Sequence, residues 1–412
     1  MTDAVAAASK TGLSSYQRKL FVFLSVATLF EGYDFMALSQ ILPQLRREMN
    51  LDETQVGAMI TWINLGTMVA FALVGLADRW GRKRLLTLTI FGYTLSTFAS
   101  GFAPNIWVLA GCQFLARMFL IAEWATSMVY AAEEFPAARR GMVIGVIQAF
   151  SSLGAIVCAG VVPYLLRTAY GWRSVYFVGI VPLIILMIAR RGLRESSRFV
   201  HEVGQTAKRS LWKIWSTPHR GRVVQLALIW GLTYICTNNA VVFWKQFAVD
   251  ERGLTDLQVG RAITIAAVAS MPLVFYAGKL LDVVGRKIGA LIIFSVGIAG
   301  TLGCYGLHGF WPLCACLVVG IFGASAVLPV LNAFTAELFP TALRADAFAW
   351  SNNLLGRITY VLSPLAVGWA AKRIHWGPAM QLTVIGPAVA LVLILVLLPE
   401  TKSRELDETA AL

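Results

Sequence analysis

Twelve long apolar stretches, separated by short polar or charged connections, make up most of the sequence. An α-helix needs about 20 apolar residues to cross the hydrocarbon core of a bilayer, and a segment in lipid must satisfy its backbone hydrogen bonds internally. Only 14% of the residues are charged, against about 25% in soluble domains. The sequence therefore predicts an all-α polytopic membrane protein with twelve transmembrane helices. The predicted helices cover residues 20–43, 54–77, 84–103, 106–133, 141–166, 173–190, 222–248, 257–281, 288–307, 311–337, 345–371 and 378–398.

The basic residues lie mostly on one side of the predicted membrane. A formal net charge of +13 suits nucleic-acid binding, but most Lys and Arg residues fall in the N-terminus, the even-numbered connections and the C-terminus. Connections rich in Lys and Arg stay in the cytoplasm. We therefore predict an integral protein of the bacterial inner (plasma) membrane, with cytoplasmic termini at 1–19 and 399–412. The expected surroundings are a lipid bilayer, with no nucleic-acid partner.

The second half of the chain repeats the first with an offset of 204 residues. Asp78 and Asp282 are 204 positions apart, and the same shift relates three further pairs: Gly81 and Gly285, Arg82 and Arg286, and Glu133 and Glu337. Coincident offsets of this kind indicate a duplication. The prediction is therefore two six-helix bundles, 20–190 and 222–398, joined by a basic cytoplasmic linker at 191–221.

The connection after the second predicted helix carries a motif of glycines and charges. It reads Gly75-Leu-Ala-Asp78-Arg79-Trp-Gly81-Arg82. The motif recurs around Asp282, where Val283 replaces its first Arg. Together with the twelve helices, this motif resembles the signature of the major facilitator superfamily. The resemblance implies two pseudo-symmetric six-helix halves with a substrate site between them near the membrane midplane. It also implies alternating access by rocking of the halves, and function as a monomer.

The same motif is a candidate conformational latch. Gly81 permits a tight turn, and Asp78 can pair with Arg79 or Arg82, so that these charges cap helix ends across the seam between the halves. We hypothesise that the latch favours the state that is open to the outside. Its candidate residues are Gly75, Asp78, Arg79, Gly81, Arg82, Asp282 and Arg286.

Motifs in the first and fourth predicted helices narrow the resemblance. Glu31-Gly-Tyr-Asp34-Phe is similar to the Asp-Gly-Phe-Asp-Phe motif of aromatic-acid and sialic-acid proton symporters. Glu123-Trp124, followed ten residues later by Glu133, resembles the fourth helix of the same symporters. The resemblance implies a proton-coupled metabolite symporter.

Two other motifs resemble those of sugar porters. Glu195-Ser-Ser-Arg follows the sixth predicted helix and Pro399-Glu-Thr-Lys follows the twelfth. However, Thr233 and Tyr234 stand where sugar porters carry the paired glutamines that bind sugar hydroxyls. A sugar is therefore the weaker prediction for the substrate.

Three acidic residues lie inside predicted membrane helices and away from the helix ends. Each costs about 2.5–3.5 kcal/mol at mid-bilayer, so such residues usually face a bundle interior or an aqueous cavity and serve transport. Glu31 and Asp34 are three residues apart and share one helix face, and Glu123 lies in the fourth helix. A desolvated acid can load and release a proton. We predict that Asp34, with Glu31 or Glu123, carries the proton.

Two arginines lie near the middle of predicted helices, Arg117 in the first half and Arg357 in the second. The planar guanidinium matches a carboxylate or phosphate group, which predicts an organic anion as substrate. The alternative is that each arginine only neutralises a buried acid, for example Arg117 with Asp34 or Glu31. Further candidates for substrate contacts are Gln113, Trp124, Gln148, Asn238, Asn239, Asn352 and Asn353.

One departure from the symporter pattern concerns the fourth helix. Gln113 stands where the acid symporters carry Arg, and Arg117 stands at the first of their glycine positions. The cation has therefore moved one turn along the helix, so the substrate of the resembled proteins cannot simply be transferred to this chain.

The predicted function is proton-driven uptake of a small organic anion by alternating access. The proton gradient supplies the energy, and no cofactor or metal is expected. Proton-driven efflux of an amphipathic compound, a sugar or polyol porter, and a metabolite sensor that does not transport are the alternatives. The sequence carries no nucleotide loop and no nucleophile–histidine arrangement, so an enzyme is not expected.

Overall fold

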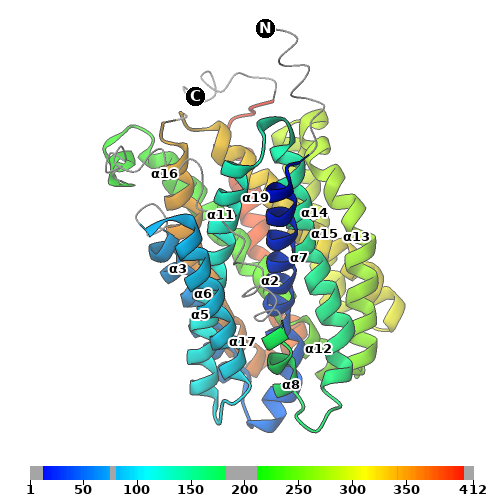
Figure 1. Ribbon diagram of the computed structural model, residues 1–412. Coiled ribbons are helices and arrows are strands. Elements are labelled where there is room, and N and C mark those ends of the chain that lie inside the picture. The colour runs from blue at the N-terminus through cyan, green and yellow to red at the C-terminus, as the bar shows by residue number, and fades with distance from the viewer. Residues whose placement is uncertain (1–12, 75–79, 182–210, 341, 403–412) are drawn as a thin grey trace.

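The computed structural model describes residues 13–74, 80–181, 211–340 and 342–402, and every regular element in these ranges is helical (Figure 1). The N-terminal half contains α2 (Ser15–Glu48), α3 (Glu53–Val74), α5 (Arg82–Ser100), α6 (Ile106–Glu134), α7 (Ala137–Leu165) and α8 (Arg173–Phe177). After the short helix η2 (Leu211–Ser216), the C-terminal half contains α11 (Arg220–Val242), α12 (Trp244–Asp250), α13 (Asp256–Val284), α14 (Arg286–Gly306), α15 (Phe310–Glu337), α16 (Arg344–Phe348), η3 (Ala349–Gly356), α17 (Arg357–Ile374), α18 (Trp376–Leu382) and α19 (Ile385–Leu397).

The observed helices follow the predicted spans. Within the described ranges, nine helices are long and apolar enough to cross a membrane, and the pair α11–α12, bent by 48°, makes a tenth. Helix α5 covers the third predicted span, and the sixth is described only over 173–181. The predicted fold, an all-α membrane protein with twelve helices in two halves, is confirmed.

The two halves pack against each other along three pairs of helices. Helix α3 lies along α17, α7 lies along α13, and α2 contacts α12. Within the N-terminal half, α2 and α7 pack side by side at the centre of Figure 1. Helices α2, α7, α11 and α13 therefore border the space between the halves.

Helices α2 and α7 cross at backbone contact beside the predicted acidic residues. A Cβ atom at Gly32 would lie 1.9 Å from the Ser151 carbonyl oxygen, and one at Gly154 would lie 1.8 Å from the Leu29 carbonyl oxygen. Small residues allow membrane helices to approach this closely. The crossing therefore fixes the height and rotation of the Glu31–Asp34 segment.

The second copy of the latch motif makes its contacts within the C-terminal half. Arg286 donates from Nη1 to Asp282 Oδ1 at 2.9 Å and from Nη2 to Glu337 Oε1 at 2.8 Å. Gly285, with φ of 97°, provides the turn before α14, a conformation that favours glycine. Among the described residues, Arg286 joins α14 to the end of α15 and has no partner in the other half.

The first copy of the motif is described only in part. Gly75, Asp78 and Arg79 lie outside the described residues, and Arg82 is placed at the start of α5 without a described side chain. Gly81 has φ of 90° and precedes α5 as Gly285 precedes α14. The latch hypothesis therefore stays a prediction.

Glu400 caps the start of α14 from the far end of the chain. Its carboxylate accepts hydrogen bonds from the backbone N–H groups of Arg286 and Lys287, each at 2.9 Å. Partial burial opposes ionisation, but these and two further backbone N–H groups hold the pKa of Glu400 below its usual range. A negative charge is favourable at a helix N-terminus.

We expect Glu400→Gln to lower the free energy of unfolding by about 0.5–1 kcal/mol at neutral pH. Because the folded pKa is depressed, the wild-type advantage is fully present above about pH 4.3, the carboxyl pKa of an unfolded chain. It disappears as the pH falls through the lower folded value. Thermal unfolding of both purified proteins at pH 7 and below pH 4 measures this. An equal difference at both pH values would contradict the capping role.

The described end of the linker packs on the eleventh membrane helix. The rings of Trp212 and Trp215, in η2, lie with centroids 4.8 and 5.2 Å from the ring of Trp350 in η3. Residues 191–210 of the predicted linker lie outside the described ranges. The contact anchors the linker directly before the segment that carries Arg357.

Candidate substrate and proton site

Glu31 and Glu123 form a buried pair of carboxyl groups between α2 and α6. Their side chains are 3% and 1% exposed and lie within hydrogen-bonding reach of each other. Ser127 Oγ donates to Glu123 Oε1 at 2.8 Å. With both groups ionised, Glu31 Oε1 and Glu123 Oε2 have no partner in the described part of the chain. A proton held between the two carboxyl groups would reduce the cost of burying them, because two adjacent carboxylates cannot both stay charged when buried.

Asp34, one turn further along α2, faces different groups. It accepts a hydrogen bond from Thr97 Oγ1 of α5 at 3.1 Å, and Tyr93 lies within hydrogen-bonding reach. Arg117 is the positive charge that acts on it, although no ion pair within 4 Å joins the two among the described residues. Asp34 is therefore held by hydroxyl groups next to a cation.

Arg117, in α6, is buried and incompletely bonded. Its side chain is 9% exposed, and its guanidinium carbon lies 4.7 Å above the ring of Phe35. No hydrogen-bond partner of its Nη1 atom is present in the described ranges. Burying an unpaired charged donor is costly, so the geometry leaves room for an anionic partner at Arg117.

Arg357 lies in an aromatic and amide cluster of the C-terminal half. Its guanidinium carbon is 5.4 Å from the ring centre of Tyr360, whose ring lies 5.4 Å from that of Tyr234. Tyr234 donates its hydroxyl hydrogen to Asn352 Oδ1 at 2.7 Å. The segment before Arg357, η3, is a π-helix, a form often found at functional sites. The π-helix was not predicted, because Pro, Gly and hydropathy patterns in a sequence do not indicate one.

The remaining predicted polar residues divide into helix-to-helix contacts and cavity groups. Asn239 Nδ2 donates to Ser363 Oγ at 2.8 Å, and Gln113 Nε2 donates to Ser100 Oγ at 2.9 Å. These two amides hold neighbouring helices together. Asn238 is 7% exposed, and its Nδ2 atom has no partner in the part of the chain that the structure describes. Asn353 is half-buried in η3.

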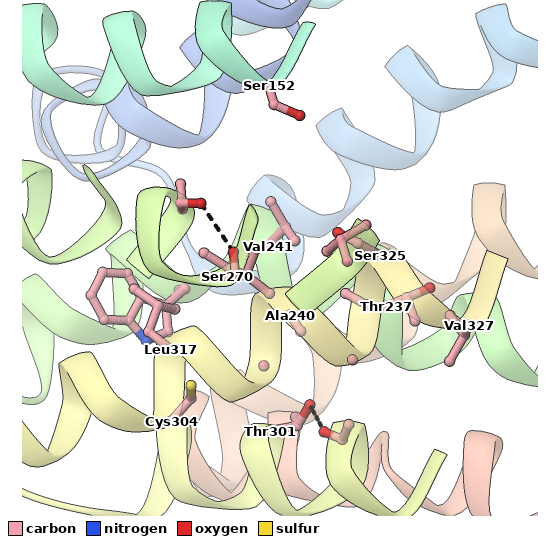
Figure 2. A pocket seen from close by; sticks show the side chains of 18 of the residues that line it. Ser152, Thr237, Ala240, Val241, Ser270, Thr301, Cys304, Leu317, Ser325 and Val327 are labelled. Carbon is pink, nitrogen blue, oxygen red and sulfur yellow. Dashed lines mark hydrogen bonds between the residues drawn. The ribbon is translucent and has the colours of Figure 1, made fainter. Parts of the chain in front are cut away.

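Trp124 and Gln148 connect the charged site to a cavity. Trp124 Nε1 donates to Gln148 Oε1 at 3.3 Å, and Trp124 is 40% exposed. Gln148 is also part of the wall of a cavity of about 420 Å³ between α7 and helices α11, α13, α14 and α15. Figure 2 shows Ser152 on one side of this cavity and Thr237, Ser270 and Ser325 on the other.

At the ends of the helices remote from η2, ion pairs join the two halves. Arg46 Nη1 lies 2.7 Å from Asp250 Oδ2, and Lys372 Nζ lies 2.9 Å from Asp52 Oδ2. Arg46 and Asp250 are 204 positions apart and so occupy equivalent places in the two repeats. These pairs were not predicted from the sequence, although the repeat offset and the opposite charges of Arg46 and Asp250 could have revealed that pair. They close this end of the seam between the halves.

Twelve membrane helices in two halves around polar and apolar cavities define a membrane transporter rather than an enzyme. A sequence profile of the Major Facilitator Superfamily matches residues 24–358 and 226–411. The chain belongs to the Major Facilitator Superfamily.

Relatives and solved structures agree with this assignment. The sialic acid transporter NanX of Escherichia coli is 23% identical over 397 residues, which are 92% of this chain and 93% of the relative. The niacin transporter NiaP of Acinetobacter baylyi is 24% identical over 449 residues, 98% and 99% of the two chains. The crystal structure of a D-xylose-proton symporter has a TM-score of 0.73 at 20% identity, covering 94% of this chain and 99% of that one. The predicted resemblance to acid transporters is confirmed, and the sugar-porter likeness holds for the fold.

Proposed function

We propose that this protein is a proton-coupled symporter that takes up a small organic acid. The observation that carries the proposal is Arg117, a buried cation near Asp34 whose Nη1 atom has no partner among the described residues. A carboxylate would supply the missing partner in the bidentate geometry that arginine favours. The relatives named above, transporters of niacin and of sialic acid, carry substrates with a carboxyl group.

Asp34 is our candidate for the coupled proton. When the substrate carboxylate is absent, ionised Asp34 is balanced by Arg117 and bonded to Thr97. When the carboxylate binds Arg117, it competes with Asp34 for the same positive charge, and protonation of Asp34 removes the repulsion. The anion and the proton therefore favour each other's binding, which is the requirement for symport.

The Glu31–Glu123 pair has a different role in this proposal. Its two carboxyl groups lie within hydrogen-bonding reach of each other and are almost fully buried, and Glu123 accepts a hydrogen bond from Ser127. A proton held there lacks the cation that exchanges partners at Asp34. We propose that the pair keeps its proton through the cycle and positions α2 against α6.

The orientation of the protein completes the proposal. With cytoplasmic termini in a bacterial plasma membrane, the ion pairs Arg46–Asp250 and Lys372–Asp52 face outward, and the cavity alternates between the two sides. The carrier works as a monomer on the proton gradient, without a cofactor.

We expect the double variant Asp250→Asn, Lys372→Gln to move the carrier toward the outward-open state. Exposed ion pairs contribute about 0.2–1 kcal/mol each, so loss of both shifts this equilibrium about 2- to 30-fold toward opening. Ser152→Cys, at an exposed position of the cavity wall, should then react faster with an impermeant thiol reagent added outside. Cys236 and Cys304, which share the wall, are replaced by serine in all variants.

The matched control is Arg173→Gln. Arg173 pairs with Glu48 inside the N-terminal half, so its loss removes an ion pair near the end of the same helix α2 without opening the seam. Equal labelling rates in the double variant and the control would argue against an outer gate at Arg46–Asp250 and Lys372–Asp52.

The symport proposal is tested with purified protein in liposomes that contain a pH-sensitive dye. Pools of mono-, di- and aromatic carboxylates are added outside, and proton entry above that of protein-free liposomes is measured. Entry that depends on one pool supports acid symport. No proton entry with any pool, together with proton exit on addition of cationic amphiphiles, would contradict symport and favour proton-driven efflux.

A further inference from the structure

Small side chains from three helices form part of the wall of the cavity between α7 and the C-terminal half. Ala240 and Thr237 come from α11, Ala267 from α13 and Ala324 from α15. Behind them, α14 and α15 are in backbone contact, since a Cβ atom at Gly323 would lie 2.3 Å from Gly297 Cα. The volume of about 420 Å³ falls in the range of small-molecule sites, about 300–1,000 Å³. The cavity can hold a single ring or a short chain.

The wall of this cavity carries no Asp, Glu, Lys, Arg or His among the described residues. Its side-chain hydrogen-bonding groups are hydroxyls, thiols, one amide and the indole N–H of Trp244, which has no partner in the described part of the chain. Several hydroxyls are already used: Ser270 Oγ donates to Ala267 O at 3.1 Å, and Thr301 Oγ1 donates to Gly297 O at 3.0 Å (Figure 2). A second charge on a bound molecule would therefore be buried without a partner, which is strongly unfavourable. An apolar group would be stabilised.

The cavity adjoins the charged site through two consecutive residues of α2. Phe35 is stacked under the Arg117 guanidinium and is 39% exposed, and Met36 belongs to the cavity wall. On the other side, Gln148 accepts a hydrogen bond from Trp124 and also belongs to the wall. A molecule held at Arg117 by its carboxylate would pass Phe35 to reach the cavity at Met36.

We infer that this cavity binds the uncharged, apolar body of the transported acid, so that the carrier selects monocarboxylates with a ring or short chain over dicarboxylates with the same carbon frame. This inference rests on the proposed function, because Arg117 must hold the carboxylate. It adds a second subsite, in the C-terminal half, that sets the substrate class.

Isothermal titration of the purified full-length protein tests the inference. Two pairs of acids are compared, benzoate with terephthalate and hexanoate with adipate. Acetate serves as the ligand that has a carboxylate but almost no apolar part. Each monocarboxylate should bind at least about tenfold more tightly than its dicarboxylate, given the cost of burying an unpaired charge. The affinity for hexanoate should exceed the affinity for acetate by about fourfold for each methylene group that is buried. Titration into protein-free micelles corrects for partitioning.

Variants at Ala324 locate the subsite. Ala324→Leu fills the cavity and should lower the affinity for benzoate and for hexanoate about tenfold. The affinity for acetate should stay the same. Ala324→Lys should raise terephthalate affinity above that of benzoate, because it supplies the missing charge. Ala240→Leu fills the cavity from α11 and repeats the test if Ala324→Leu fails to fold. The matched control is Ala269→Leu, at an exposed position of α13, which should bind as the wild type does.

The outcomes separate the inference from the proposed function. If the acids bind but the dicarboxylates match their partners, or if neither cavity-filling variant weakens benzoate, the subsite is wrong while anion binding stands. If no carboxylate binds at all, the proposed function fails and the inference falls with it.

Discussion

Liposomes that contain the Asp34→Asn variant should show no accumulation of the acid against a concentration gradient. Asparagine keeps the size of Asp34 and can still bond Thr97 and Tyr93, but it cannot release a proton. The variant should therefore exchange labelled for unlabelled acid across the membrane while failing to use a pH gradient. Uptake of labelled acid under an imposed pH gradient, compared with exchange at equal pH, measures both properties.

The controls for this result are Glu123→Gln and Thr97→Val. Glutamine can still bond Glu31 and Ser127 without a shared proton, so Glu123→Gln should retain accumulation. Thr97→Val removes the hydroxyl that donates to Asp34 and should change the pH dependence without abolishing coupling. Full accumulation by Asp34→Asn, with loss in Glu123→Gln, would move the coupled proton to the buried pair.

Arg117→Gln should lose about 30-fold or more in affinity for the acid, because removing one partner of a buried charge pair costs about 2–5 kcal/mol. Arg117→Lys keeps the charge but loses the planar fork, so we expect a smaller loss. Titration of both purified variants with the acid that drives proton entry measures the affinities. Arg357→Gln, tested in parallel, shows whether the C-terminal half contributes a second contact.

The alternative role for Arg117 predicts a different pattern. If Arg117 only neutralises Asp34, then Arg117→Gln should leave the affinity for the acid intact and should lower the stability. Adding Asp34→Asn in a double variant should then restore the stability. Anion binding at Arg117 predicts no such rescue. Melting temperatures of all variants show whether each one is folded.

The membrane topology could be predicted from the sequence because hydropathy and repeats are local properties. The twelve apolar stretches and the offset between Asp78 and Asp282 were enough to predict the two halves. The bend between α11 and α12 and the π-helix η3 could not be predicted. The bend falls at Phe243, with neither Pro nor Gly at the break, and η3 contains Gly356 only as its last residue.

The candidate site was predicted in its residues but not in its arrangement. Glu31 and Asp34 were expected to share one face, and yet Glu31 contacts Glu123 while Asp34 contacts Thr97. Two residues on one side of a helix can face different neighbours when three helices meet there. The neighbour of each side chain depends on how α2 is rotated, which the backbone crossing at Gly32 decides.

The cavity in the C-terminal half left no signal in the sequence. Its walls combine Ala, Gly, Ser and Thr residues with larger apolar ones such as Trp244 and Phe294, from helices far apart in the chain. Such residues occur in most membrane helix contacts. Only the three-dimensional structure shows that residues such as Ala240 and Ala324 border one empty space. The amide nitrogens of Asn239 and Gln113, which were predicted as substrate contacts, donate to side chains of neighbouring helices. Their predicted contact with the substrate stays a prediction.

The most direct test of the account is the number of protons taken up when the acid binds. Isothermal titration in buffers with different ionisation enthalpies gives this number for the purified protein, without a membrane through which weak acids could leak. We predict uptake of about one proton per bound acid in the wild type, because linkage ties the proton on Asp34 to the anion on Arg117, and none in Asp34→Asn. Binding without proton uptake in the wild type, or equal uptake in Asp34→Asn, would contradict the coupling of these two residues.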